Sequence, residues 1–470
     1  MQGFRKSYLM TGYLILLVAA LTVGCSTKED PDETMTLCGN HSCGNLAMVT
    51  IDTTSDGFQY LDPSLSPDGT RLAFTADWAT IPTDPNYEGE PILSRQVLLL
   101  PIPENIWTDS MRTREPVSGI QDIGGELVEL QPFYYQFGED PIPTDNAADI
   151  NKGAPVWLDE STLLMQARFG RRDRIIRVDI SNPSDAMAEV LYYEPDDTLI
   201  IGGWIYYHDK PALSPDGRWM AFTRFGCDLE PNEPDAVCTG QSIWILDMST
   251  TDNPRTATAF PLTSECSGMT DPCWNPDGTV LCFAARTDLI GETSGPTAEL
   301  FRVDFDAAEA ETGALTLDRN LQRLTTTSVS DGDPITGLHA YAPTFSTSGG
   351  EIYFVSSRRA PASTQRGRNI WRVPADGRLE PALLFFSRYD DVDPVMDWNT
   401  GTLIMCSKMG FPTEVLNALE QETIDYWYAY NDTSENDLSD VEIHRRAAQD
   451  REQLEYFEDV MSHLFLFRGF

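Results

Sequence analysis

A short phrase recurs six times along the chain and constrains the fold more than any other feature. Three copies are intact: residues 62–74, 210–222 and 271–283 each run through Ser-Pro-Asp-Gly or Asn-Pro-Asp-Gly into an apolar segment that ends in Phe. Three further copies, in which the Pro-Asp-Gly signature is lost, begin at Pro155, Pro343 and Pro394. Repetition of this kind indicates an architecture in which one small unit is repeated and each unit packs against its neighbours.

Each phrase predicts two strands joined by a tight turn. Pro fixes φ, the Asp side chain accepts hydrogen bonds from nearby backbone, and Gly adopts positive φ without strain. The turn residues are Pro67, Asp68 and Gly69, then Pro215, Asp216 and Gly217, then Pro276, Asp277 and Gly278. A third apolar strand follows in most units, and a fourth often follows it. Four antiparallel strands per unit predict an all-β fold, a six-bladed β-propeller of four-stranded blades.

A propeller must also join its last blade to its first, because open blade edges invite aggregation. The apolar segment 46–51 precedes the first phrase, so we expect it to complete the sixth blade. Residues 440–463 predict a short amphipathic C-terminal helix with Val441 and Ala447 among its apolar positions. Residues 464–470 are a strand candidate, and residues 424–429 are an alternative third strand for the sixth blade.

The phrase resembles the PD40 (WD40-like) repeat of the TolB-like six-bladed β-propeller, and the resemblance covers residues 46–470. It supports the same fold. That family places an α/β domain before its propeller, whereas about twenty polar residues separate Cys25 from the first predicted strand here. The resemblance therefore implies a binding module without specifying the family's Tol–Pal role.

The amino terminus predicts export. Arg5 and Lys6 precede an apolar run that ends at Gly24, before Cys25, which is typical of a signal peptide. The segment 21–25 resembles a bacterial lipobox, so we expect a lipoprotein signal peptide at 1–24, lipidation of Cys25 and a polar tether at 25–45. By resemblance to the known sorting rule, Ser26 favours an outer-membrane lipoprotein facing the periplasm or the exterior. An uncleaved anchor or a plain signal peptide are the alternatives.

Cysteine spacing fits an oxidising compartment. Three pairs lie close in sequence within loops and are disulfide candidates: Cys38 with Cys43, Cys227 with Cys238, and Cys266 with Cys273. Cys282 and Cys406 lie in apolar strand-like segments, where we expect buried free thiols.

Acidic and histidine side chains near the leading prolines suggest a second function. By resemblance to the family, these positions approach the propeller axis, so His208, His339, Asp62, Asp271 and Asp393 are candidate ligands for Zn²⁺ or Mn²⁺. Asp209 and Asp391 are nearby. Such a site is similar to that of propeller lyases acting on uronate sugars. The competing interpretation is a water-filled channel in which Asp caps adjacent turns. The acidic residues within 228–235 are a weaker candidate for binding Ca²⁺, and the alternative interpretation is a solvated acidic hairpin.

The long insertion between the first two copies is acidic, Pro-rich and aromatic, and we expect loops at 78–91 and 131–149. Residues 133–137 are either a contact surface or the cover of a blade side.

Charge limits the possible partners. The chain has 33 Lys+Arg against 73 Asp+Glu, a formal charge of −40, which excludes a nucleic-acid binder. No G-x-S-x-G or P-loop motif occurs in the sequence. We therefore expect a cell-envelope lipoprotein that binds or scaffolds an envelope protein or peptide, needs no cofactor and contacts the membrane through its lipid anchor. The alternative is a metal-dependent polysaccharide lyase or hydrolase acting at the channel mouth with bound Ca²⁺, Mn²⁺ or Zn²⁺.

Overall fold

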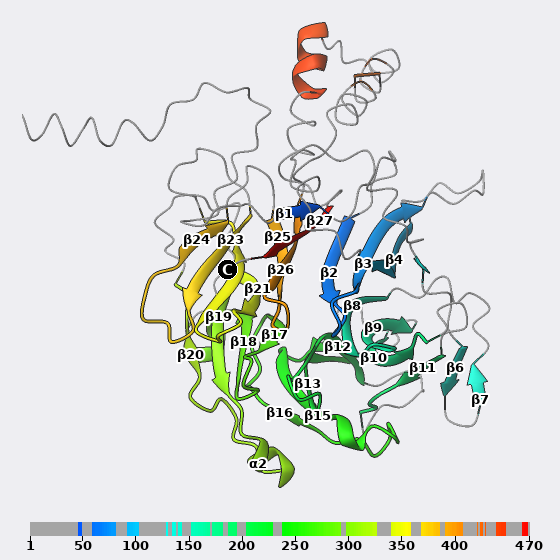
Figure 1. Cartoon of the computed structure of the whole chain (residues 1–470), viewed down its shortest axis with the longest axis vertical. Helices are drawn as coiled ribbons and strands as arrows, with labels where there is room; N and C mark the ends of the chain where they lie inside the picture. Colours follow the sequence, from blue (N-terminus) through cyan, green and yellow to red (C-terminus); the bar gives the residue numbers. More distant parts are fainter. Residues whose placement is uncertain are drawn as a thin grey trace, which may run out of the picture. The chain divides into compact units, whose positions relative to one another are not determined.

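Six β-sheets follow one another around a common centre (Figure 1). The structure, a computed structural model of the whole chain, describes residues 46–48, 59–80, 92–102, 128–129, 134–137, 140–142, 152–169, 172–181, 187–194, 204–228, 237–292, 298–326, 340–358, 368–385, 391–407, 421, 424–425, 428, 439–447 and 463–468. Every blade has at least four strands, so the predicted all-β, six-bladed propeller is confirmed.

The strands alternate in direction through most of each blade, beginning at the centre. The first blade contains β2 (Gln59–Leu65), β3 (Arg71–Thr80), β4 (Ile92–Pro101) and β5 (Val128–Glu129). The second contains β8 (Lys152–Asp159), β9 (Thr162–Phe169), β10 (Arg172–Asp179) and β11 (Met187–Val190), followed by β6 (Tyr134–Phe137) and β7 (Asp140–Ile142). The third contains β12 (Trp204–Leu213), β13 (Trp219–Asp228), β15 (Ser242–Asp247) and β16 (Ala259–Pro261), with β14 (Val237–Cys238) beside β13.

The remaining blades repeat this order. The fourth contains β17 (Met269–Trp274), β18 (Val280–Ala285), β19 (Glu299–Asp304) and β20 (Gln322–Arg323). The fifth contains β21 (Ala340–Phe345), β22 (Glu351–Ser356), β23 (Asn369–Pro374) and β24 (Ala382–Phe385). The sixth contains β25 (Asp391–Asp397), β26 (Thr402–Ser407), β27 (His463–Arg468) and β1 (Leu46–Met48). Short helices are η5 (Met248–Thr250), η6 (Thr287–Ile290) and α2 (Ala307–Glu311).

The sixth blade is completed by strands from near both ends of the sequence. β27 pairs with β26, and β1 pairs with β27 so that Ala47 lies opposite Leu466. The predicted role of the segment at 46–51 is thus confirmed. The alternative third strand at 424–429 is wrong, because the described residues there are helical.

The C-terminal helix is present at residues 440–447, the described part of the predicted segment. Ile443 and Ala447 are buried in a cluster with Ile424, whereas Val441 is 80% exposed. Val441 was expected on the apolar face. Residues four apart share a helix face, so the face defined by Ile443 and Ala447 turns Val441 away.

The expected loop at 131–149 also needs correction, since it contains β6 and β7. β6 pairs in parallel with β11 and so extends the outer edge of the second blade. Its Tyr-Tyr-Gln-Phe sequence favours an extended conformation, and an exposed strand edge supplies unpaired backbone groups for it to pair with.

Each innermost strand carries a bulge at the residue before its leading proline. These six residues have φ between 47° and 53°: Asp62, Ala154, Lys210, Asp271, Ala342 and Asp393. Strand pairing shifts register at each of these sites. Proline cannot donate to the ladder, and a bulge is where a strand tolerates it. We call these six residues the bulge ring.

The predicted turns form as the sequence indicates. Gly69, Gly217 and Gly278 have φ of 71°, 72° and 68°. In the first turn, Ser66 Oγ donates to Asp68 Oδ1 at 2.7 Å and accepts from the backbone N–H of Arg71 at 2.9 Å. These side chains supply bonds that the two strands cannot make at the reversal.

Three tryptophans join neighbouring blades. Trp157 Nε1 donates to the Ser64 carbonyl (2.9 Å), Trp274 Nε1 to the Ala212 carbonyl (3.0 Å) and Trp398 Nε1 to the Phe345 carbonyl (3.2 Å). These bonds connect the second blade to the first, the fourth to the third and the sixth to the fifth. Each indole, buried for Trp157 and Trp274 and partly buried for Trp398, therefore adds a directional bond to the apolar packing between sheets.

We predict that Trp274 stabilises the protein both through its hydrogen bond and through its apolar packing. Trp274→Phe should cost about 1 kcal/mol, chiefly the lost bond to Ala212. Trp274→Ala should cost about 3–5 kcal/mol because it also leaves a cavity. Urea unfolding followed by circular dichroism measures both changes. Equal losses in the two variants would contradict the proposed contribution of packing.

Candidate functional site

The six innermost strands enclose a cavity of about 680 Å³ at the centre of the propeller. β2, β8, β12, β17, β21 and β25 lie toward the centre of Figure 1. All six members of the bulge ring line the cavity, together with the prolines that follow them and turn residues such as Pro67, Pro215 and Pro276. The bulge before each leading proline thus places the side chain of the bulge residue of every blade on the cavity wall.

The bulge ring contains three aspartates but only one lysine. Lys210 Nζ lies 2.5 Å from Asp62 Oδ1 and 3.6 Å from Asp271 Oδ1, and its side chain is 31% exposed. Burial disfavours the ammonium, but the carboxylates of Asp62, Asp271 and Asp393 outweigh it and raise the pKa of Lys210 well above its usual value. Lys210 is therefore a permanent cation surrounded by acidic side chains.

Two of the acidic side chains around Lys210 have raised pKa values. Burial and the neighbouring Asp62 raise the pKa of Asp393 to about 6, although Lys210 opposes the shift. Burial also raises the pKa of Asp209 to about 6. Both are largely ionised at pH 7, so the carboxylates outnumber the single ammonium and the cavity is acidic.

Two of these carboxylates also join blades. Asp393 Oδ2 accepts a hydrogen bond from the Asp62 backbone N–H at 3.3 Å, and Asp271 Oδ2 accepts one from the Ala342 N–H at 3.2 Å. The first bond crosses from the sixth blade to the first, and the second from the fourth to the fifth. Asp side chains were expected to cap adjacent turns, whereas these two satisfy backbone N–H groups of a neighbouring blade.

The structure brings together only part of the predicted metal-ligand set: Asp62, Asp271 and Asp393 lie around Lys210, whereas His208 lies elsewhere. His208 is 1% exposed and its Nε2 lies 3.0 Å from Glu194 Oε1, away from the bulge ring. His339 and most of the acidic segment 228–235 lie outside the described residues. Among the residues that the structure describes, no group of three His, Cys, Asp or Glu side chains could hold a metal ion. His208 lies apart from the three aspartates because it precedes the bulge and keeps regular strand pairing with Arg224, whereas the bulge residues line the cavity.

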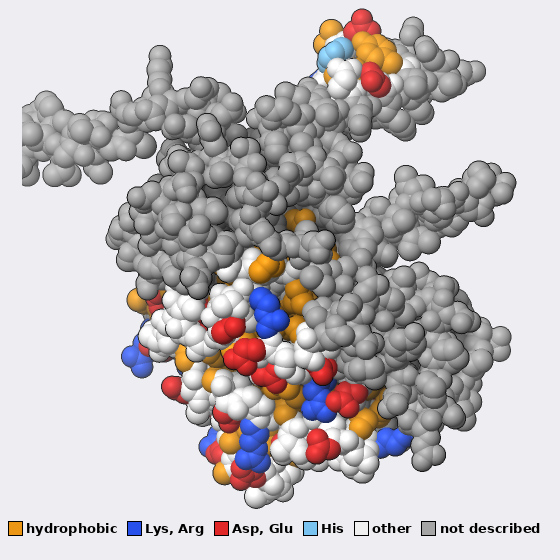
Figure 2. All heavy atoms as spheres, turned by 45° about the vertical axis from the view of Figure 1, so that its right-hand side comes forward, with side chains coloured by type: hydrophobic (Ala, Val, Ile, Leu, Met, Phe, Trp, Pro, Cys, Tyr) orange, Lys and Arg blue, Asp and Glu red, His pale blue; other side chains and the backbone are white. Residues whose placement is uncertain are grey.

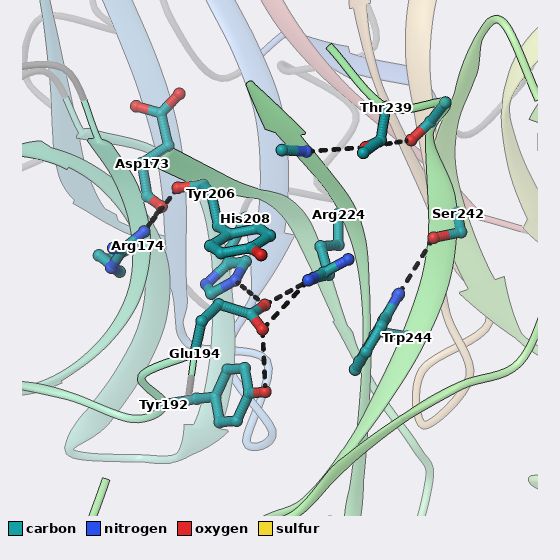
Figure 3. Close-up of polar contacts among 12 residues, drawn as sticks. Asp173, Arg174, Tyr192, Glu194, Tyr206, His208, Arg224, Thr239, Ser242 and Trp244 are labelled. Atoms are coloured by element: carbon teal, nitrogen blue, oxygen red, sulfur yellow. Dashed lines mark hydrogen bonds and ion pairs between the residues drawn. The ribbon is translucent and has the colours of Figure 1, made fainter. Parts of the chain in front are cut away.

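His208 instead belongs to a buried polar cluster between the second and third blades (Figure 3). Glu194, which follows β11, accepts bonds from Arg224 Nε at 2.6 Å, Arg224 Nη2 at 3.2 Å and Tyr192 Oη at 3.3 Å. The Arg224 guanidinium also lies over the rings of Tyr206 and Trp244. Glu194 is 3% exposed on its side chain, so these partners replace the water it has lost.

The cluster has a defined charge state. Burial alone would raise the pKa of Glu194, but hydrogen bonds from His208 and Arg224 lower it to about 2. Burial lowers the pKa of His208, with Glu194 opposing the shift. At neutral pH the cluster is therefore an ion pair of Glu194 and Arg224 with a neutral histidine that donates from Nε2.

One predicted disulfide is confirmed and another is wrong. Cys227 and Cys238 are bonded, which confirms that pair, and Cys282 and Cys406 are buried free thiols as expected. The Cys266–Cys273 pair is wrong: both are free. Strand register places Cys273 opposite Cys282, whereas Cys266 Sγ contacts the Gly268 carbonyl. Cys25, Cys38 and Cys43 lie outside the described residues.

Sequence reasoning missed Lys210 and Glu194. A signal for Lys210 existed, because it occupies the position that Asp62, Asp271 and Asp393 hold in other copies of the phrase. Glu194 has no such signal, since His208 and Arg224, which fix its charge state, come from β12 and β13 of the next blade.

We predict that Glu194→Gln destabilises the protein by about 3 kcal/mol at pH 7, because it leaves the Arg224 cation buried without its partner. The folded-state pKa of Glu194 is about 2, below its ordinary 4.5. Its contribution is therefore complete above pH 4.5 and is lost as the pH falls toward 2. Urea unfolding between pH 7 and pH 3 should show less acid destabilisation in the variant. Tyr192→Phe is the matched control and should keep the wild-type pH dependence.

Three comparisons with known proteins place this chain beside solved structures only. No family model matches the chain, and no curated protein matches its sequence. Among solved structures, TolB from Acinetobacter baumannii is similar at 14% identity and a TM-score of 0.37, covering 72% of this chain and 57% of that one. A puromycin-hydrolyzing peptidase from Mycobacterium tuberculosis has 14% identity and a TM-score of 0.43, covering 78% and 45%. Pyrococcus horikoshii acylaminoacyl peptidase has 10% identity and a TM-score of 0.38, covering 76% and 50%. The chain thus spans about half the length of these proteins.

Proposed function

We propose that this protein is a cell-envelope lipoprotein whose propeller binds a positively charged segment of an envelope protein or peptide at the central cavity. The acidic cavity is the observation that carries this proposal. It is large enough for several side chains and lies on a rigid scaffold of six blades. Rigid walls reduce the conformational entropy lost when a segment binds.

Charge supports the choice of a cationic segment. Asp62, Asp209, Asp271 and Asp393 lie around Lys210, and the chain as a whole carries a formal charge of −40. On the face seen in Figure 2, by contrast, acidic and basic side chains are interspersed among the described residues. An acidic concave wall attracts and orients a cation more strongly than a mixed surface does.

The amino-terminal sequence supports attachment at the membrane through Cys25. In the part of the chain that the structure describes, no helix is long and apolar enough to cross a bilayer. Lipidation of the cysteine would hold the protein at a membrane surface, because several acyl chains together anchor firmly.

We predict that a photo-cross-linker in the cavity captures one discrete partner in the native cells. Benzoylphenylalanine at Pro215 or Asn399, which are exposed residues of the cavity wall, should give the same adduct by immunoblotting. At Leu379, which is 67% exposed in the turn before β24, it should give none. Adducts of equal yield at all three positions would contradict binding at the cavity.

The same assay tests the charge. Asp216 lines the cavity and accepts from the Arg218 N–H at 3.1 Å; Asp376, away from the cavity wall, accepts from the Arg378 N–H at 3.1 Å. Asp216→Lys should reduce the adduct about tenfold by repelling a cationic segment, whereas the matched Asp376→Lys should leave it unchanged. Equal effects of the two substitutions would overturn the cationic partner.

We predict that Cys25→Ser abolishes incorporation of an alkyne-labelled fatty acid and moves the protein from the membrane to the soluble fraction. Cys38→Ser, in the same tether, should keep both the label and the membrane fraction. Labelling that survives in Cys25→Ser would contradict the lipoprotein assignment.

A further inference from the structure

Two free thiols face each other across the inner strands of the fourth blade. Cys273 on β17 is the register partner of Cys282 on β18. We infer that Cys273 and Cys282 are a redox-active pair that forms a reversible disulfide across the wall of the central cavity. This inference concerns the oxidation state of the chain and is independent of the partner proposed above.

The pair lies at a special place in the repeat. It is the first register pair after the bulge, where the ladder resumes beyond Asp271. The corresponding pairs in the other blades are Ser64 with Ala73, Val156 with Leu164, Ala212 with Ala221, Thr344 with Tyr353 and Val395 with Ile404. Of these six described pairs, only the one in the fourth blade contains two cysteines.

Strand geometry permits the bond. Directly opposed residues of antiparallel strands lie about 4.5–5.5 Å apart at Cα, which is within the range that disulfides span. Side chains of such a pair also extend from the same face of the sheet. The chain offers a precedent, because Cys227 and Cys238 are opposed in the same way on β13 and β14 and are bonded with a Cα–Cα distance of 4.0 Å.

The two thiols differ in access. Cys273 is half-buried and lines the central cavity, whereas Cys282 is fully buried behind it in an apolar cluster. An oxidant that enters the cavity therefore meets Cys273 first. Burial and the adjacent Cys282 thiol raise the pKa of Cys273 well above its ordinary value, so oxidation is slow at neutral pH and faster in alkali.

The chemistry requires a disulfide oxidant, such as oxidised glutathione or an oxidised dithiol protein. The Cys273 thiolate attacks one sulfur of the oxidant, forming a mixed disulfide and releasing one thiolate. The Cys282 thiolate then attacks the Cys273 sulfur, forming the intramolecular bond and releasing the second thiolate. Two electrons pass to the oxidant, and its two thiolates take up the two protons lost by the cysteines.

Oxidation would affect the cavity wall directly. Asp271 contacts Lys210 and lies two residues before Cys273, on the part of β17 that bulges away from β18. A disulfide at Cys273 would tie the innermost strand to β18 immediately beside this bulge. It would therefore restrain the part of the wall that holds one of the carboxylates around Lys210.

Peptide mapping of the purified full-length protein tests the pair. The protein is incubated with oxidised glutathione at about pH 8.5, where a larger fraction of the Cys273 thiol is ionised than at neutral pH. It is then alkylated and digested with a protease that cuts before Asp. Cuts before Asp271, Asp277 and Asp288 separate residues 271–276 from 277–287, and Cys266 lies on a third peptide. We expect a cross-link between the first two peptides that disappears after treatment with dithiothreitol.

Variants test the order of the two steps. Cys282→Ser lacks the second thiol, so Cys273 should accumulate as a stable adduct with glutathione. Cys273→Ser should leave Cys282 unmodified, because Cys282 is 0% exposed. Cys266→Ser is the matched control and should keep the wild-type cross-link. Full alkylation of Cys273 and Cys282 in oxidised wild-type protein, or a cross-link of either to Cys266, would overturn the inference.

Discussion

Joining the sixth blade to the first is the constraint on which the rest of this structure depends. Each sheet buries its faces against neighbours, so an open ring would expose two apolar faces and the strand edges beside them. β1 and β27 solve this by completing a blade that begins with β25 and β26. The hydrogen bond between Asp62 and Asp393 crosses the same junction near the axis. Backbone pairing at the outside and a carboxylate at the inside therefore hold the ring closed together.

The bulge ring connects this closed fold to its chemistry. An extra residue with positive φ before each proline interrupts the ladder once per blade and lines the cavity. Ala at two of the six positions leaves space, Asp at three supplies charge, and Lys210 partly neutralises it. Two of the acidic groups, Asp271 and Asp393, have two roles: they accept hydrogen bonds from backbone N–H groups and they contribute negative charge to the cavity. The buried cluster around Glu194 does for the second and third blades what these carboxylates do at the axis: it joins adjacent sheets through satisfied polar contacts.

The sequence predicted the architecture in detail but only part of the candidate site, because Asp62, Asp271 and Asp393 line the cavity and His208 does not. Turn residues such as Asp68 and Gly69 act on their own neighbours, so their roles are readable without the rest of the fold. His208 was grouped with Asp62 because both precede a leading proline by a short distance. In the folded chain the bulge interrupts the strand between them: Lys210, in the position of Asp62, lines the cavity, whereas His208, two residues earlier, still pairs with Arg224 and is buried in the blade. The Cys266–Cys273 pair failed for a related reason: closeness in sequence does not determine the register of two strands.

The sequence alone determined the number of blades, their four-stranded plan, the chain segment near the amino terminus that completes the last blade and the position of the tight turns. These depend on backbone preferences of Pro, Asp and Gly and on the period of apolar segments, which are local properties. Only the tertiary structure decided which side chains meet: Lys210 with Asp62, Glu194 with Arg224, and Cys273 with Cys282. Those contacts arise from strand register, from the extra residue at each bulge and from closure of the ring, which bring together residues that no local pattern relates.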